Sequence, residues 1–325
     1  MIDIINRKFR DYKIHKNYGK IYNPIYNLSC EFDKRREPEI FNNEGQRYNL
    51  FFLRDFHTAH DPYFPYSKYF LFDRFNIGLD THFYTHDTML EQVGKPQKKY
   101  GILYETPAIV PKDYDIFDKN PSLNKDFDKI FTYSQKILDK VSNSFFVPFQ
   151  AAPWYGLNNG TIDSELYLKK NKNISMLSSK KNMCQLHKFR LDLANKCKNY
   201  NLADTYGTFD GGSVVEIEVP LTEYRYSIVI ENEIEPLYFS ERLTNCFMSM
   251  TIPIYCGATE IDKFFNKDGI ITIEPKDYDS IENILKKCNE EEYNNRINAV
   301  IDNFNRVQNY KNVWDSMYLK YLKEN

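Results

Sequence analysis

Residues 224–265 of this chain read YRYSIVIENEIEPLYFSERLTNCFMSMTIPIYCGATEIDKFF. The β-branched and aromatic run at 224–230 is typical of a buried parallel strand, and a second such run follows at 251–256. Between the two runs, Ser240 can cap a helix whose first turn carries the acid Glu241 near the positive end of the helix dipole. The stretch therefore predicts a strand, a helix and a second strand of one parallel sheet.

Polar side chains cluster where the first strand ends and the helix begins. Glu231 and Asn232 follow the strand directly, and Glu241 and Arg242 open the helix. In open α/β sheets, ligands bind beyond the carboxyl ends of the strands, and helix N-termini attract phosphate groups. We therefore expect this junction to hold a sugar nucleotide. The alternative is that Glu241 is only a favourable first-turn acid and Arg242 only a surface partner of nearby acids.

Strand and helix patterns alternate through the rest of the second half. A strand is predicted at 173–179, with Ser178 at its end, and apolar residues at three-to-four spacing predict a helix at 182–198. Further elements are predicted at 270–274 (strand), near 278–303 (helix) and at 306–323 (helix). Alternation of this kind argues for a parallel sheet with helices packed on it.

The first half of the chain mixes strands and helices less regularly. A strand pattern at 98–105 ends at Glu105, and an extended stretch with two prolines at 144–156 suggests a crossing between domains. A length of 325 residues suits two α/β domains. We expect these domains to face each other across a cleft. Their predicted bounds are 1–155 for the N-terminal domain, 156–305 for the C-terminal domain, and 306–325 for a last helix packing across the junction.

Composition and charge argue against several classes of protein. The formal net charge is −2, so there is no basic excess of the kind that binds nucleic acid. No stretch has the pattern of a signal peptide, and no apolar run approaches the ~20 residues of a membrane span. The six cysteines form no C-x-x-C pair and are expected to be buried thiols in a reducing compartment. We therefore expect a cytoplasmic protein without a transmembrane segment, with peripheral membrane contact as the alternative.

Two histidine pairs resemble halves of a zinc site. His57 and His60 lie three residues apart, and His82 and His86 lie four residues apart. Neither pair has the cysteines or the HExxH context that a zinc site needs. We predict no metal site.

The order of motifs resembles the donor-binding signature of the α-1,3/1,4-fucosyltransferases, glycosyltransferase family 10. The Phe-Glu-Asn-Ser-like run of that family looks like residues 230–233, and its Tyr-x-Thr-Glu-Lys motif looks like residues 238–242. Its Val/Ile-Pro-Ile/Val-x-x-Gly turn looks like residues 252–257. Its Glu-Ser-Pro element looks like residues 105–107, and its helix arginine looks like Arg190. The resemblance covers roughly residues 100–305.

This resemblance implies a fold, a reaction and a set of donor contacts. The fold is the GT-B arrangement of two Rossmann-like domains. The reaction is metal-independent transfer of fucose from GDP-fucose to a hydroxyl of a galactose- or N-acetylglucosamine-type glycan, with inversion and without a cofactor. Glu241 would hold the ribose hydroxyls, and Arg190 and Arg242 would neutralise the pyrophosphate. The further donor-binding residues would be Asn232, Tyr238, Glu231 and Ser178.

The resemblance also assigns the general base. Glu105 would be the general base, since a carboxylate at the end of a strand that faces the cleft can take the acceptor proton. His57, His60 and Tyr63 lie before the stretch that carries the resemblance, and they are candidate contacts to the acceptor sugar because the first domain should line the acceptor cleft. Without a metal, the leaving diphosphate needs fixed cations, and a guanidinium is a better bidentate partner for phosphate than an ammonium group.

Three residues depart from the family pattern. Arg242 replaces the family lysine, Ser240 replaces a threonine, and Glu233 replaces a serine. Glu233 adds a negative charge near the expected leaving group. Two alternatives therefore stay open: another GDP-linked deoxysugar as the donor, or a non-catalytic glycan-binding protein on a decayed transferase fold.

Overall fold

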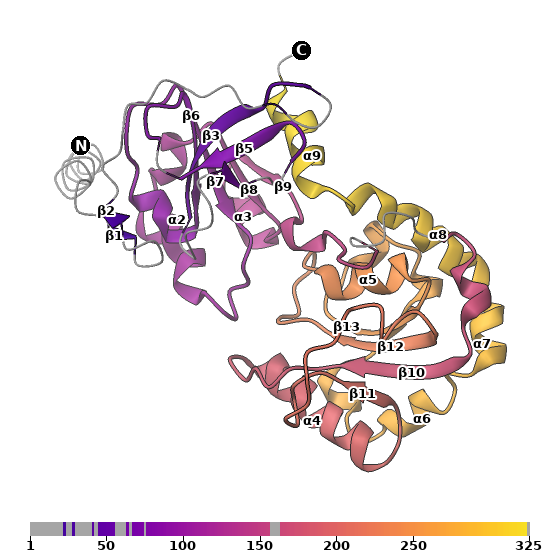
Figure 1. Cartoon of the computed structure of the whole chain (residues 1–325). Helices are drawn as coiled ribbons and strands as arrows, with labels where there is room; N and C mark the ends of the chain where they lie inside the picture. Colours follow the sequence, from indigo (N-terminus) through magenta and orange to yellow (C-terminus); the bar gives the residue numbers. More distant parts are fainter. Residues whose placement is uncertain are drawn as a thin grey trace. The chain divides into compact units, whose positions relative to one another are not determined.

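The computed structural model describes residues 41, 45–55, 67–74, 76–156 and 163–323, together with the backbone of 22–23, 28–29 and 63–64. The chain divides into two compact units (Figure 1). The first unit contains the described residues up to Glu105, Val110–Val147 and the segment from Trp314 onward. The second unit contains Thr106–Ile109 and Pro148–Val313.

The first unit contains a seven-stranded sheet in the order β4-β5-β3-β6-β7-β8-β9. All neighbours are parallel except β4 and β5. The strands are β3 (Asn49–Arg54), β4 (Tyr63–Phe64), β5 (Phe70–Asp73), β6 (Thr81–Thr85), β7 (Lys98–Leu103), β8 (Lys129–Thr132) and β9 (Ser144–Phe146). The short helices of this unit include α2 (Ile116–Lys119) and α3 (Gln135–Lys140). Outside the sheet, β1 (Tyr22–Asn23) pairs with β2 (Leu28–Ser29).

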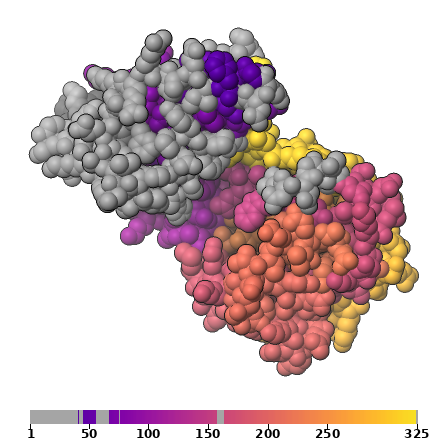
Figure 2. Space-filling view, viewed as in Figure 1, coloured from indigo at the N-terminus to yellow at the C-terminus, as the bar shows by residue number. Residues whose placement is uncertain are grey.

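The second unit contains a five-stranded sheet that is parallel throughout, in the order β11-β10-β12-β13-β14. Its strands are β10 (Lys172–Leu177), β11 (Asp204–Tyr206), β12 (Tyr224–Ile230), β13 (Ile252–Cys256) and β14 (Ile271–Thr272). The main helices are α4 (Gln185–Asn199), α5 (Glu241–Met248) and α8 (Ile297–Val307). In Figure 2, the orange and yellow segments of this unit lie against one another on one continuous surface.

The stretch 224–265 folds as its sequence predicts. All seven residues of β12 are buried, as expected for a central parallel strand. The side chain of Ser240 accepts a hydrogen bond from the backbone N–H of Arg242 at 3.3 Å and so caps α5. The predicted strand–helix–strand unit is β12, α5 and β13, and the two strands pair in parallel.

This sheet has a topological switch point between β10 and β12. From β10 the chain passes through α4 to β11 on one side, and from β12 it passes through α5 to β13 on the other side. Because such crossovers are right-handed and these two leave in opposite directions, α4 and α5 cover opposite faces of the sheet. Sheets of this kind bind ligands in the crevice outside the carboxyl ends of the strands at the switch point, which are β10 and β12 here.

The two last predicted helices are interrupted in the structure. The helix expected near 278–303 is three helices, α6 (Ile281–Leu285), α7 (Glu290–Asn295) and α8. Asn289 starts α7, because its side chain accepts a hydrogen bond from the backbone N–H of Glu292 at 3.0 Å.

The helix expected at 306–323 is also divided. After α8 the chain forms a 3-10 turn and then α9 (Val313–Met317), which continues into a π-helical turn at Tyr318–Leu322. The hydroxyl of Tyr318 accepts from the side-chain amide of Asn49 at 3.0 Å, and its ring stacks on Tyr69 with centroids 5.2 Å apart. These contacts join the end of the chain to the first sheet.

Within the described residues, none of the helices is both long enough and apolar enough to cross a bilayer. The five cysteines of that part of the chain are free thiols, and four of them are buried. The exception is Cys184, which is half-exposed just before α4.

Candidate donor-binding site

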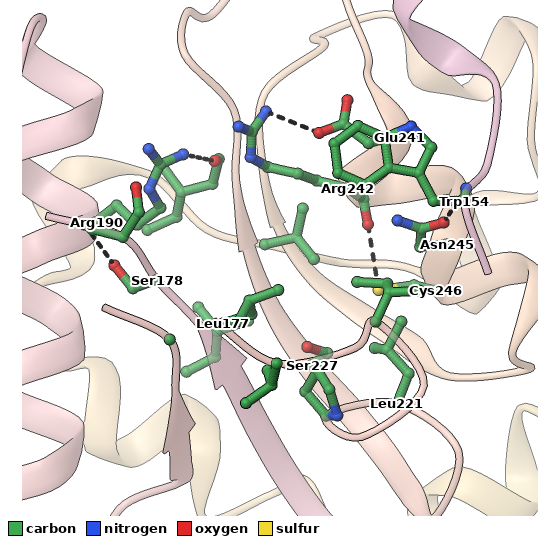
Figure 3. Close-up of a pocket in the computed structure, with 18 of the residues that line it drawn as sticks. Trp154, Leu177, Ser178, Arg190, Leu221, Ser227, Glu241, Arg242, Asn245 and Cys246 are labelled. Carbon is green, nitrogen blue, oxygen red and sulfur yellow. Dashed lines mark hydrogen bonds and ion pairs between the residues drawn. The ribbon is translucent and has the colours of Figure 1, made fainter. Parts of the chain in front are cut away.

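A cavity of about 640 Å³ in the second unit opens at the switch point between β10 and β12. Its volume is in the range of small-molecule sites. Four of the predicted donor-binding residues line it, namely Ser178, Arg190, Glu241 and Arg242 (Figure 3). The structure therefore brings together, at one cavity, side chains that lie up to 64 positions apart in the chain.

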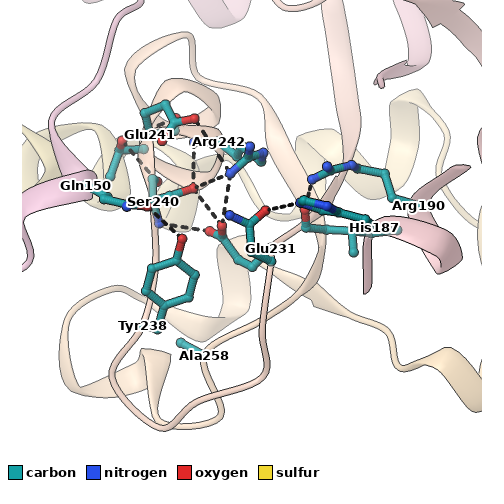
Figure 4. Close-up of polar contacts among 12 residues, drawn as sticks. Gln150, His187, Arg190, Glu231, Tyr238, Ser240, Glu241, Arg242 and Ala258 are labelled. Atoms are coloured by element: carbon teal, nitrogen blue, oxygen red, sulfur yellow. Dashed lines mark hydrogen bonds and ion pairs between the residues drawn. The ribbon is translucent and has the colours of Figure 1, made fainter. Parts of the chain in front are cut away.

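The start of α5 is held by a buried carboxylate. Glu231 has no exposed surface, and its two oxygens accept from the backbone N–H of Ser240 at 2.9 Å and from its hydroxyl at 2.6 Å (Figure 4). Nη1 of Arg242 lies 3.7 Å from Oε2 of Glu231 and 3.7 Å from Oε1 of Glu241. Burial raises the pKa of Glu231, and the charge of Arg242 opposes this shift. Glu231 therefore orients Ser240 and Arg242, and a direct contact of Glu231 with the donor stays a prediction.

The glycine after β13 is required by the packing of this carboxylate. A Cβ atom added at Gly257 would lie 2.6 Å from Cγ of Glu231 and 2.3 Å from the hydroxyl of Tyr255. Only a residue without a side chain fits there. The turn is thus part of the wall that fixes Glu231.

Arg190 approaches the cavity from α4. Its side chain is buried, and its Nη1 donates to the carbonyl of Ile230 at 3.1 Å. Burial, and then the nearby charge of Arg242, lower the pKa of Arg190 to about 10, so it stays cationic at neutral pH. Two guanidinium groups that line one cavity repel each other, and an anion between them relieves that repulsion.

Tyr238 is not among the residues that line the cavity. Its side chain is buried, and its hydroxyl donates to the side-chain oxygen of Gln150 at 2.7 Å. The residue fixes the loop between β12 and α5, and its direct contact with phosphate stays a prediction.

Two residues on the apolar side of the cavity, Trp154 and Asn245, were not predicted from the sequence. Trp154 lines the cavity and is 57% exposed. The amide oxygen of Asn245, on α5, accepts from the backbone N–H groups of Trp154 at 2.7 Å and Tyr155 at 2.8 Å. The signal in the sequence was a tryptophan in the extended stretch at 144–156, which offers a flat apolar face next to a polar site.

The candidate base Glu105 lies in the first unit, two residues after β7. Nε2 of His86 accepts from its backbone N–H at 3.1 Å, and the hydroxyl of Tyr114 donates to its carbonyl at 2.5 Å. Nε2 accepts, so a neutral ring carries its proton on Nδ1, and this atom lies 3.2 Å from the carboxylate of Asp113 without the geometry of a hydrogen bond. The backbone of Glu105 is therefore held from both sides, and its side chain is half-buried.

The histidines suspected of zinc binding have structural roles where the structure describes them. His86 holds the backbone of Glu105, and Nδ1 of His82 lies 2.9 Å from the hydroxyl of Tyr84. Burial lowers the pKa of His82 to about 4, so the ring is neutral. In the described ranges, no three His, Cys, Asp or Glu side chains gather as a metal site would require.

The side chains of the three acceptor-side candidates are not described in the structure. His57 and His60 lie outside the described residues, and only the backbone of Tyr63 is described, as part of β4. Their role stays a prediction.

The comparisons with known proteins identify the second half of the chain. Residues 167–319 match the model of "Glycosyltransferase family 10 (fucosyltransferase) C-term". These residues form a family 10 glycosyltransferase domain. A protein of Acanthamoeba polyphaga mimivirus, named as a putative fucosyltransferase, is 33% identical over 114 residues, which are 34% of this chain. The match spans 19% of the length of that viral protein.

The fold has a match among solved structures. The crystal structure of an alpha1,3-fucosyltransferase with GDP-fucose aligns with 85% of this chain and 92% of its own, at 15% identity and a TM-score of 0.51. This match confirms the predicted GT-B fold built on two parallel sheets, and the family match confirms the predicted family for residues 167–319.

The family 10 domain uses its unusual Glu233 as a structural contact. The carboxylate of Glu233 accepts from the backbone N–H of Ala108 at 3.0 Å. Ala108 belongs to the short segment Thr106–Ile109, which is part of the second unit and directly follows Glu105. Burial raises the pKa of Glu233, and the hydrogen bond from Ala108 opposes the shift. The carboxylate of Glu233 is thus bound by the backbone N–H of Ala108.

We expect Glu233→Ser, which restores the family residue, to leave GDP affinity within about twofold while lowering the free energy of unfolding by about 1 kcal/mol. The loss corresponds to one hydrogen bond of ordinary net strength, because Glu233 is only half-buried and solvent screens its charge. Calorimetric titration with GDP and denaturant unfolding measure the two effects. Tighter GDP binding by tenfold or more in the variant would show instead that Glu233 repels the leaving group.

A buried lysine supports the floor of the cavity. Nζ of Lys170 donates to the carbonyl of Leu221, which lines the cavity, and to the hydroxyl of Thr251, both at 2.8 Å. Burial lowers the pKa of Lys170 to about 7. The unfolded chain keeps the ordinary lysine value near 10.4. Between these values the unfolded state binds more protons, so this group makes the fold more stable as pH rises.

We expect the free energy of unfolding of wild type to rise with pH, relative to Lys170→Met, between about pH 7 and 8.5. The difference should approach ~1.4 kcal/mol per pH unit at its steepest. The free energies of unfolding are measured by urea titration at each pH. Equal changes with pH in the two proteins across this window would contradict the proposed role of Lys170. Taking the difference removes the contributions of other groups that titrate in the same range.

Proposed function

We propose that the chain is an inverting fucosyltransferase that moves fucose from GDP-fucose to a hydroxyl of a galactose- or N-acetylglucosamine-type glycan. One observation carries the proposal: Arg190, Arg242 and Glu241 line a single cavity at the switch point of a family 10 domain. The solved fucosyltransferase that resembles this chain is described with GDP-fucose, which supports the choice of donor.

The charges of the cavity suit a nucleoside diphosphate sugar. In the proposed complex, the diphosphate lies between Arg190 and Arg242, beside the N-terminus of α5. The carboxylate of Glu241 accepts hydrogen bonds from the ribose hydroxyls. The apolar side of the cavity, with Trp154, takes the guanine ring. The second unit is thus the donor-binding domain, and the first unit binds the acceptor.

The proposed reaction is a single displacement. The acceptor oxygen forms a bond to the anomeric carbon of fucose while the bond from that carbon to the diphosphate oxygen breaks. The carboxylate of Glu105 takes the hydroxyl proton, and GDP leaves with the bonding electron pair. Fixed guanidinium groups offset the charge that develops on the leaving group, so the proposal includes no metal and no cofactor.

Hydrolysis of the donor tests this function without a known acceptor. We expect slow release of fucose from GDP-fucose, faster than release from GDP-mannose or UDP-sugars, followed by proton NMR. The fucose released first should have the opposite anomeric configuration to the donor. Retained configuration would contradict an inverting displacement, and a preference for another GDP-deoxysugar would change the donor. Glycan binding with no heat on titration with GDP would favour the non-catalytic alternative.

A further inference from the structure

The side-chain amide of Asn232 is held in one orientation by a histidine. Nδ1 of His187, in the first turn of α4, accepts from the backbone N–H of Met183 at 3.1 Å. A neutral ring then carries its proton on Nε2, and this atom lies 2.8 Å from Oδ1 of Asn232. The ring therefore donates to the amide oxygen, and this fixes which end of the amide is the oxygen.

The surroundings of His187 keep the ring neutral. The side chain is buried, and burial is the main cause of its lowered pKa. The charges of Arg190 on the same helix, Arg242 on α5 and Lys181 before α4 act in the same direction, while the hydrogen bond to Asn232 opposes them. Three cations thus lie around the histidine that holds Asn232.

The NH₂ group of Asn232 is the end of the amide that remains for another partner. Among the residues that the structure describes, its nitrogen donates to no acceptor. The backbone around it is fixed as well: the thiol of Cys184 donates to the carbonyl of Asn232 at 3.2 Å, and Arg190 donates to the carbonyl of Ile230 at 3.1 Å. Asn232 is half-buried and is not itself among the residues that line the cavity, but it lies two positions after Ile230, which lines the cavity and accepts from Arg190.

We propose that His187 is a positioning residue that presents the NH₂ group of Asn232 to the diphosphate oxygens of the donor. This inference rests on the proposed function, because it needs a nucleoside diphosphate next to Arg190 and Arg242. An amide donor contacts a phosphate oxygen without adding a further positive charge beside two guanidinium groups. His187 reaches Asn232 across 45 positions of sequence, so no local motif marks it.

The decisive variant is Asn232→Asp. A carboxylate still accepts from Nε2 of His187, so the structural contact is kept, but an oxygen replaces the NH₂ group. We expect the affinity for GDP to fall by about 10- to 100-fold, because one charge-assisted hydrogen bond is replaced by repulsion. Asn195→Asp, on the exposed face of α4, makes the same change of charge and is the control. Equal GDP affinity in Asn232→Asp and wild type would overturn the proposal.

A double-mutant cycle tests whether His187 acts through Asn232. His187→Phe keeps the ring shape but has no N–H, and we expect about 5- to 20-fold weaker GDP binding. His187→Gln restores a donor near the position of Nε2 and should recover affinity to within about threefold. In the Asn232→Ala background, His187→Phe should cause little further loss. Additive losses would show that His187 supports the fold only.

The outcomes separate this inference from the function it rests on. Failure of wild type to bind GDP by titration calorimetry would count against the proposed function. GDP binding by wild type, with unchanged binding in Asn232→Asp, would leave the function standing and reject the role of the His187–Asn232 pair. Circular dichroism and thermal unfolding of every variant identify any that has lost its fold.

Discussion

Replacing Glu105 by Gln is expected to reduce turnover by about 10²- to 10⁴-fold while the affinity for GDP stays within about twofold. A positioned general base contributes a rate factor of this size, and Gln keeps the shape of the side chain but cannot take a proton. The backbone of Glu105 is held by His86 and Tyr114, so the substitution should not move the strand end. Donor hydrolysis gives the rate, and titration calorimetry gives the affinity.

The matched control for this variant is Glu91→Gln. Glu91 is an exposed carboxylate of the same unit whose contact is an ion pair with Arg54 at 2.6 Å. Its substitution should leave hydrolysis unchanged. Normal hydrolysis in Glu105→Gln would remove Glu105 from the mechanism, and a parallel loss of GDP affinity would show a structural defect in place of a missing base.

The second large effect is expected from the two arginines. Arg190→Met and Arg242→Met should each weaken GDP binding by about 10- to 100-fold, since each removes charge-assisted contacts worth about 1.5–3 kcal/mol. Salt screens exposed charges more than buried ones, so the loss of GDP affinity should become smaller at high salt where the arginine is exposed. The side chain of Arg242 is 30% exposed, whereas Arg190 is buried. Arg242→Met should therefore show the stronger dependence on salt.

Arg306→Met provides the control for these arginines. Arg306 pairs with Asp302 on the exposed face of α8, in the same unit, at 3.0 Å. GDP affinity should be unchanged in this variant. If Arg306→Met weakened GDP binding as much as Arg190→Met did, the effect would reflect the net charge of the domain, and the cavity would lose its special role.

The central part of the fold was predictable because its determinants are local. The apolar run of β12, the cap at Ser240 and the glycine turn at Gly257 each lie within a few residues of the structure that they specify. Parallel pairing of β12 with β13 then follows from a short helical crossover. The helix pattern near 278–303 was less informative, because a cap at Asn289 interrupts it without disturbing the apolar spacing.

The candidate site was predicted in part, and its limits have a physical reason. The positions of Arg190, Glu241 and Arg242 follow from the ends of strands and the starts of helices. The burial of Glu231 depends on Ser240 and Gly257 packing around it, and the role of His187 depends on Asn232. These are tertiary contacts, which residue spacing does not encode, so the sequence did not predict the structural role of Glu231 and passed over His187.

A crystal structure of the chain with GDP tests the central claim most directly. The account predicts the diphosphate between the guanidinium groups of Arg190 and Arg242, with the ribose hydroxyls on the carboxylate of Glu241. GDP bound elsewhere on the chain, or bound in this cavity with its phosphates directed away from both arginines, would contradict it.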